Sequence, residues 1–229
     1  MRAVGIVGGL GPESTIDYYR RILQVWQEHH PGSAPGILID SLDVDRGLRL
    51  IDADRPGLAR YLLESLGRLA RAGVDFAVLA ANSPHVVFDD LLARSPVPLL
   101  SIVEVCAGEA ARRGWKTLGL LGTGFTMDGT FYPVTCARHG IEVVVPEPRD
   151  RAWVHERYIG ELLRGDFREE TRKGMLEVIG RLGERTGMDG LALAGTELPL
   201  LLRSPTLGGV PVLDTTELHV GAIVDRLRS

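Results

Sequence analysis

The stretch "RAGVDFAVLAANS" (residues 71–83) returns later in the chain as "RTGMDGLALAGTE" (residues 185–197). Both copies place an arginine, a glycine and an aspartate before a short apolar run, which ends in small residues. Matching residues such as Asp75 and Asp189 are 114 positions apart. The same offset sets "GIVG" (5–8) against "GLLG" (119–122), and "VPLLSIVEVCAG" (97–108) recurs at an offset of 113 as "VPVLDTTELHVG" (210–221). Three matches in one order predict a chain built from two duplicated halves.

Each half alternates short apolar segments with amphipathic ones. Residues 56–73 and 168–187 carry the apolar spacing of helices, and Gly73 and Gly187 stand where a helix end favours a left-handed residue. This order predicts an α/β fold of two similar three-layer half-domains with parallel sheets, related by a pseudo-two-fold duplication, with an active-site cleft between them. We expect residues 1–101 plus 214–229 to form the first half-domain and residues 102–213 the second.

The composition is that of an ordinary soluble protein, with 229 residues, 45% of them hydrophobic, and a net charge of −4. Basic residues are scattered, which argues against nucleic acid as a partner. No apolar run approaches the ~20 residues of a membrane span, and the chain opens as a strand with no charged leader. We therefore expect a cytoplasmic protein that binds neither nucleic acid nor membranes.

The residues that usually hold cofactors are scarce. Lys116 and Lys173 are the two lysines, and both fall in helix-like or pre-strand contexts. This disfavours pyridoxal phosphate (PLP), which needs a lysine for its Schiff base. Cys106 and Cys136 are far apart and form neither a disulfide framework nor a metal-binding pattern. We expect no cofactor and no metal.

Ligands of open α/β sheets bind beyond the carboxyl ends of the strands. The segments predicted there are "GGLGPEST" (8–15), "DSLDVDR" (40–46), "AANSPH" (80–85), "GTGFTMDG" (122–129) and "AGTELP" (194–199). The first lacks the Gly-x-Gly-x-x-Gly spacing of a dinucleotide loop. Its glycines either form a tight turn into a helix with Pro12 in its first turn, or expose backbone N–H groups to a substrate carboxylate.

Two of these segments are symmetry mates: Ala81 matches Gly195, Asn82 matches Thr196, and Ser83 matches Glu197. Such a pair suits chemistry on both sides of one carbon. Inverting a stereocentre without a cofactor requires a base that removes the α-proton from one face and an acid that delivers a proton to the other.

Taken together, these motifs resemble the aspartate/glutamate racemase family, whose members are PLP-independent amino-acid racemases. "GIVGGLGPESTIDYY" (5–19) and "GLLGTGFTMDGTFY" (119–132) look like the starts of that family's two halves. "VLAANSPHVVFDDL" (78–91) and "ALAGTELPLLL" (192–202) correspond to its two catalytic loops, and "VPVLDTTELH" (210–219) to its closing strand. The resemblance covers nearly the whole chain and implies a homodimer that acts on a small amino-acid or carboxylate substrate.

The chain departs from the family at the reacting atoms. The resemblance implies a catalytic cysteine in each loop, and the corresponding positions hold Ala81 and Gly195, whose side chains cannot carry a proton. Cys106 and Cys136 lie elsewhere in the sequence, and we interpret them as buried structural residues. The neighbouring polar residues of both loops are retained, which argues against simple decay of the site.

The resemblance leads to a substrate-binding set comprising Gly9, Arg46, Ala81, Asn82, Thr123, Thr126, Gly195, Thr196 and His219. Arg46 would bind a distal carboxylate through its guanidinium fork, or else be a surface arginine. Thr126, like Asp128, would otherwise cap a helix. His219 would otherwise serve packing.

Glu197 is the candidate proton carrier of the second loop, because a pocket can raise the pKa of a carboxylate. Ser83, assisted by His85, is the candidate of the first loop, although a capping or packing role for His85 is equally compatible with its place after Pro84. Two other functions remain open: a carboxylate-binding protein without turnover, and a related isomerase, decarboxylase or lyase that uses groups other than cysteine.

Overall fold

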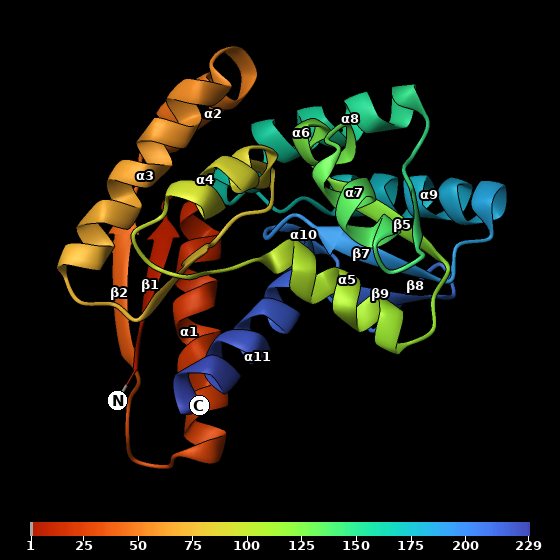
Figure 1. The fold of residues 1–229 in the computed structure, drawn as a ribbon. Helices are drawn as coiled ribbons and strands as arrows, with labels where there is room; N and C mark the ends of the chain where they lie inside the picture. Colours follow the sequence, from red (N-terminus) through yellow and green to blue (C-terminus); the bar gives the residue numbers. More distant parts are fainter. Residues whose placement is uncertain (1) are drawn as a thin grey trace. The chain divides into compact units, whose positions relative to one another are not determined.

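The computed structural model describes residues 2–229, in which short strands are interspersed with helices along the chain (Figure 1). The chain divides into two compact units. Unit 1 contains the residues up to Ile102 together with Thr216–Ser229, and unit 2 contains Val103–Thr215. Unit 1 therefore takes its last helix from the C-terminal end of the sequence.

Unit 1 is built on a four-stranded parallel sheet in the order β2-β1-β3-β4. Its strands are β1 (Ala3–Gly8), β2 (Gly36–Ser41), β3 (Phe76–Leu79) and β4 (Leu99–Leu100). The helices are α1 (Pro12–His29), α2 (Val44–Ala53), α3 (Arg55–Arg71), α4 (Phe88–Arg94) and α11 (Thr215–Arg228), with the 3₁₀ turn η1 (Ser83–Val87).

The central strands of unit 1 are covered on both faces. On one face, Val4 and Ile6 of β1 join a buried cluster with side chains of α1 and α11, including Tyr18 and Ile223. On the other face α3 lies so close that a Cβ on Gly5 would stand 3.1 Å from Leu69. Burial from both sides explains why these strands are apolar throughout rather than alternating.

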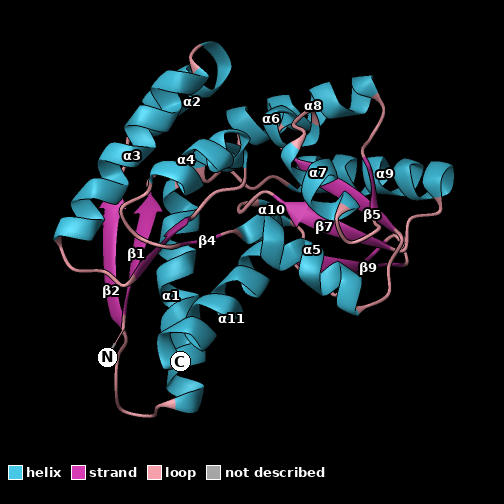
Figure 2. Ribbon diagram, viewed as in Figure 1, coloured by secondary structure: helices cyan, strands magenta, loops and turns pink. Residues whose placement is uncertain are grey.

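Unit 2 repeats this plan with a sheet in the order β6-β5-β7-β9-β8. Figure 2 shows its strands β5, β7 and β9 in magenta. Its strands are β5 (Thr117–Gly122), β6 (Glu142–Val144), β7 (Gly190–Ala194), β8 (Thr206–Leu207) and β9 (Val210–Asp214). The helical segments are α5 (Ile102–Arg112), α6 (Gly124–Met127), α7 (Phe131–Ala137), α8 (Pro148–Gly160), η2 (Leu162–Arg164), α9 (Glu169–Thr186) and α10 (Leu198–Leu201). Strand β8 pairs antiparallel with β9, and the other pairings are parallel.

A hydrogen bond from an exposed aspartate to a backbone amide recurs at the same place in both units. Asp75 Oδ2 accepts a hydrogen bond of 2.7 Å from the amide of Ala3, where β1 begins. Asp189 Oδ2 accepts from the amides of Lys116 and Thr117, where β5 begins, at 2.6 and 2.9 Å. The duplicated aspartate thus closes the amino end of the central strand in each unit.

The predicted α/β class with two parallel-sheet halves is confirmed. The helix expected at 56–73 is α3, and the helix expected at 168–187 is α9. Gly73 and Gly187 follow these helices with φ values of +86° and +60°, in the left-handed region that favours glycine. Within residues 2–229, no helix is both long and apolar enough to cross a membrane.

Replacing Asp189 with asparagine is expected to lower the free energy of unfolding by about 1 kcal/mol at neutral pH, because an exposed carboxylate that binds two amides loses its charge. The amides of Lys116 and Thr117 lower the pKa of Asp189, so the carboxylate stabilises the fold above its unfolded pKa and loses that effect as the pH falls through the folded value. Urea unfolding should show a gap between wild type and Asp189→Asn at pH 7 that narrows at pH 3. Asp225→Asn, which removes an exposed carboxylate paired with Arg228, is the control for charge alone. A gap that does not change with pH would contradict this account.

Candidate active site

The segment "AANSPH" follows the end of β3, and its small residues are buried. The amide of Ala80 continues the sheet by donating to Val7 O at 3.0 Å. Ala81 and Asn82 follow and are both buried, and Ser83, half-buried, opens η1 with Pro84 behind it. Ala81 and Asn82 therefore lie just beyond the carboxyl end of β3, as the sequence predicted.

His85 is held inside this loop. Its Nδ1–H donates to Asn82 O at 3.1 Å, because a carbonyl can only accept, and its ring stacks on Phe88 with centroids 4.6 Å apart. Burial lowers the pKa of His85 to about 4. The ring is therefore neutral at pH 7 and weakly basic, so it orders the loop and would give Ser83 little help as a base.

Gly9, at the end of β1, is fixed by its surroundings. Its φ is +80°, and an added Cβ would collide with the backbone of Leu42. Its amide donates to Thr15 Oγ1 at 2.8 Å. The amide thus has an acceptor within unit 1, and a substrate-binding role for Gly9 stays a prediction.

Arg46 lies in the first turn of α2, beyond the end of β2. Asp43 caps this helix by accepting from the Arg46 amide at 2.6 Å. The guanidinium carbon of Arg46 stands 4.2 Å from the centroid of the Tyr61 ring, a cation–π contact that holds an exposed cation in a defined place. The planar guanidinium group of Arg46 has the geometry that binds a carboxylate through two hydrogen bonds.

His219, on α11, uses both ring nitrogens within unit 1. Nε2–H donates to Leu100 O at 3.2 Å, so Nδ1 accepts from the Tyr18 hydroxyl at 2.9 Å. Burial, with a smaller effect of His85, lowers the pKa of His219 to about 3. His219 thus ties α11 to α1 and to the end of β4, and contact with a substrate would require one of these bonds to open.

In unit 2 the end of β5 carries Thr123 and Thr126, which are both buried. Thr123 is the N-cap of α6: its Oγ1 accepts from the Thr126 amide at 3.3 Å and lies 3.3 Å from the Thr126 hydroxyl. The sequence suggested Thr126 or Asp128 as the residue that caps this helix, whereas in the structure the cap is Thr123. The two hydroxyls lie together at the carboxyl end of the central strand.

The end of β7 carries Gly195, Thr196 and Glu197, all buried. Glu197 Oε2 accepts a hydrogen bond from the Tyr158 hydroxyl and another, of 3.1 Å, from Thr196 Oγ1. The amide of Glu197 points back to Tyr158 Oη at 3.3 Å. A carboxylate with these two hydroxyl donors is satisfied despite being only 1% exposed.

Tyr158 belongs to a helix that the sequence did not connect with the site. Helix α8 presents Arg151, His155 and Tyr158 at helical spacing toward the strand ends. Arg151 pairs with Asp128 at 2.8 Å, His155 Nδ1 accepts from the Gly124 amide at 3.1 Å, and Tyr158 reaches Glu197. This i, i+4, i+7 pattern of polar and aromatic residues was the one signal available in the sequence.

The two cysteines stand apart from the strand ends. Cys106 is on α5 and Cys136 on α7, both buried. Burial raises the pKa of the Cys106 thiol, and it raises that of Cys136 to about 11. Both thiols are therefore protonated at neutral pH and poor nucleophiles or bases. Among residues 2–229, no three His, Cys, Asp or Glu side chains gather as metal ligands would.

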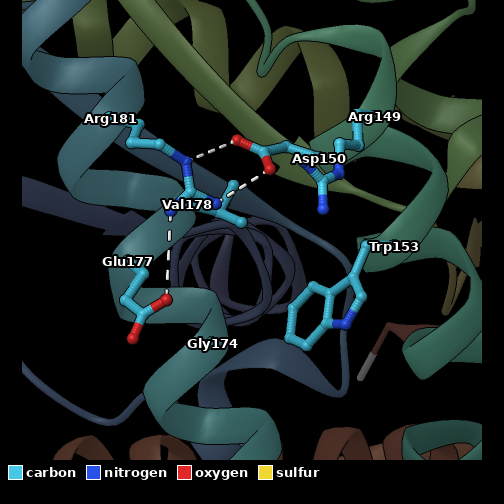
Figure 3. A pocket seen from close by; sticks show the side chains of 7 residues that line it. All are labelled: Arg149, Asp150, Trp153, Gly174, Glu177, Val178 and Arg181. Atoms are coloured by element: carbon cyan, nitrogen blue, oxygen red, sulfur yellow. Dashed lines mark hydrogen bonds and ion pairs between the residues drawn. The ribbon is translucent and has the colours of Figure 1, made fainter.

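A pocket of about 480 Å³ lies between α8 and α9, and its lining includes Asp150, Trp153 and Arg181 (Figure 3). Arg181 is bound to Asp150 at 2.8 Å through two N–H groups. None of the lining residues belongs to a strand-end loop.

Comparison with known proteins finds one family model, described as Asp/Glu/Hydantoin racemase, that matches residues 7–223. A candidate Asp/Glu racemase from Yersinia pestis has a similar structure, with a TM-score of 0.88, 34% identity and 100% of both chains covered. An aspartate racemase homologue from Pyrococcus horikoshii OT3 gives 0.84 and 31%, also over 100% of both chains. The broad specificity amino-acid racemase RacX of Bacillus subtilis (strain 168) is 28% identical over 149 residues, which span 62% of this chain and 63% of that relative.

The two buried histidines predict a distinct acid response. Unfolded chains protonate histidine below about pH 6.5, whereas the folded chain keeps His85 neutral down to about pH 4 and His219 to about pH 3. The unfolded state then binds more protons, so the free energy of unfolding should fall as the pH drops through this window. NMR titration of the ring Cε1 resonances should show both rings neutral at pH 5.5, with exposed His139 as the internal reference. Protonation of either buried ring above pH 6 would refute this.

Proposed function

Because the chain belongs to the Asp/Glu/hydantoin racemase family, we propose that it is a cofactor-independent racemase or epimerase of a small amino acid or dicarboxylate. The observation that carries the proposal is the presence of polar residues at two duplicated strand ends: buried Asn82 and half-buried Ser83 after β3, and buried Thr196 and Glu197 after β7. That both loops would serve one pocket stays a prediction from the duplication, as do the homodimer and independence from PLP.

Substrate recognition is assigned to the loop hydroxyls and amides. Asn82, Thr123 and Thr196 offer donors for an α-carboxylate at the carboxyl ends of the sheets. Arg46, held over Tyr61, would bind a distal carboxylate, which favours acidic substrates. The similarity to a relative named for broad specificity extends the substrates worth testing to neutral amino acids.

Proton transfer must use groups other than thiols at positions 81 and 195, since alanine and glycine carry no proton. Glu197 is the proposed carrier of the second loop. Its carboxylate is buried, and a desolvated carboxylate is a stronger base than one in water. Ser83 is the proposed carrier of the first loop, in a setting where His85 is neutral.

A second function is favoured by the same two substitutions. A protein that binds a carboxylate without turning it over has no need of a proton carrier at Ala81 or Gly195, and would still keep the hydroxyls and amides that hold the ligand. This alternative is distinguished from catalysis by measurement of binding and exchange on the same samples.

Incubation of the protein in D₂O with single enantiomers of a broad amino-acid panel should incorporate deuterium at Cα, as detected by NMR or mass spectrometry. Glu197→Gln should reduce the exchange rate by about 100-fold or more, the usual size of a general acid–base contribution. Glu184→Gln, an exposed site on α9, should leave the rate unchanged.

Absence of exchange with every substrate would overturn the racemase proposal. Should an amino acid or dicarboxylate raise the melting temperature in the same samples without exchange, the binding function would take its place.

A further inference from the structure

Gly195 occupies a position where no side chain fits. A Cβ built on it would stand 2.5 Å from Tyr158 Cε2, 2.7 Å from Tyr158 Oη and 2.9 Å from Tyr158 Cζ. These separations lie well inside van der Waals contact. Gly195 does not have the positive φ that favours glycine at Gly9. The requirement for glycine at position 195 therefore comes from the tyrosine ring and not from the backbone.

The group that lies nearest to the missing side chain is thus the phenol ring of Tyr158. Its Oη would lie 2.7 Å from a Cβ on residue 195, and Tyr158 is only 2% exposed. The hydroxyl makes two hydrogen bonds with Glu197: it donates one to the carboxylate and accepts one from the amide. Thr196 Oγ1 fixes the carboxylate in turn.

We infer that Tyr158 is the proton-carrying residue of the β7 loop, acting with Glu197 as a relay that takes the place of a side chain at position 195. The inference rests on the proposed function and names the atom that would meet the substrate. In this arrangement Glu197 is the acceptor behind Tyr158 rather than the group that touches Cα.

The step balances without a further reactant. The Cα–H bond of the substrate breaks and an O–H bond forms at Tyr158 Oη, while the original Oη–H bond breaks and an O–H bond forms at Glu197 Oε2. The electron pair of the broken C–H bond remains on the substrate, so one negative charge passes from Glu197 to the carbanion. Reversal of these transfers delivers a proton to the same face, and Glu197 exchanges its proton with solvent between turnovers.

The buried phenol keeps its proton at neutral pH and can therefore pass it on. Burial, followed by the charge of Glu197, raises the pKa of Tyr158 above its ordinary value of about 10. Because the step leaves a proton on Glu197, the carboxylate is the final base, and the phenol carries the proton between Cα and that carboxylate.

The first experiment separates the relay from mere packing. Tyr158→Phe keeps the ring and removes the proton, so we expect the rate of α-deuterium incorporation in D₂O to fall at least 100-fold with little change in melting temperature. Tyr132→Phe removes another buried hydroxyl of unit 2, on α7, and should stay within threefold of wild type.

The outcomes are distinct. A wild-type rate in Tyr158→Phe overturns the relay and leaves the racemase proposal standing. A wild-type protein that exchanges no amino acid overturns the proposed function and the relay with it. Loss of exchange in Tyr158→Phe, with substrate still raising the melting temperature, supports the relay as a catalytic role and not a folding one.

A second measurement tests the geometry without activity. Gly195→Ala should lower the melting temperature of the wild type, whereas in a Tyr158→Ala background the same change should cost little, because the ring that it meets is gone. Gly180→Ala on α9, where an added Cβ meets nothing within 4 Å, is the matched control. Equal losses from Gly195→Ala in both backgrounds would show that Tyr158 does not fill this space and would overturn the inference.

Discussion

A strand covered by helices on both faces can carry no unpaired polar side chain along its length, and this constraint governs both units. The central strands β1 and β5 are buried from end to end apart from their first residues. Polar side chains are therefore confined to the two ends of the central strands. Asp75 in unit 1 and Asp189 in unit 2 lie at the amino ends, and the loops with Asn82 and Glu197 lie at the carboxyl ends. Structure and candidate function are divided between opposite ends of the same strands.

The loops at the carboxyl ends of the strands are held in place by different groups in the two units. In unit 1 the loop after β3 is organised by a neutral histidine that bonds its own backbone and stacks on Phe88. In unit 2 the loop after β7 is organised by a helix from the same unit, which inserts Tyr158 against Gly195 and Glu197. The duplication fixed where the loops lie, whereas neighbouring helices determine which groups meet at them.

The fold was predictable because it follows from local patterns and from a repeat that the chain carries twice. The ends of β3 and β7, and the small residues there, could be located from the same repeat. The contact of Tyr158 with Glu197 could not, since the two are 39 residues apart and meet only through the packing of α8 across the sheet edge. The hydrogen bonds of Gly9 and His219 likewise involve partners, Thr15 and Tyr18, that no spacing rule selects.

The collision between Tyr158 and any side chain at position 195 also restricts how this chain can change. A single substitution that placed a cysteine at position 195 would bring its Cβ into the Tyr158 ring. A side chain at position 195 therefore requires a smaller residue at position 158. The two positions form an epistatic pair, in which the residue at one determines what the other can accept.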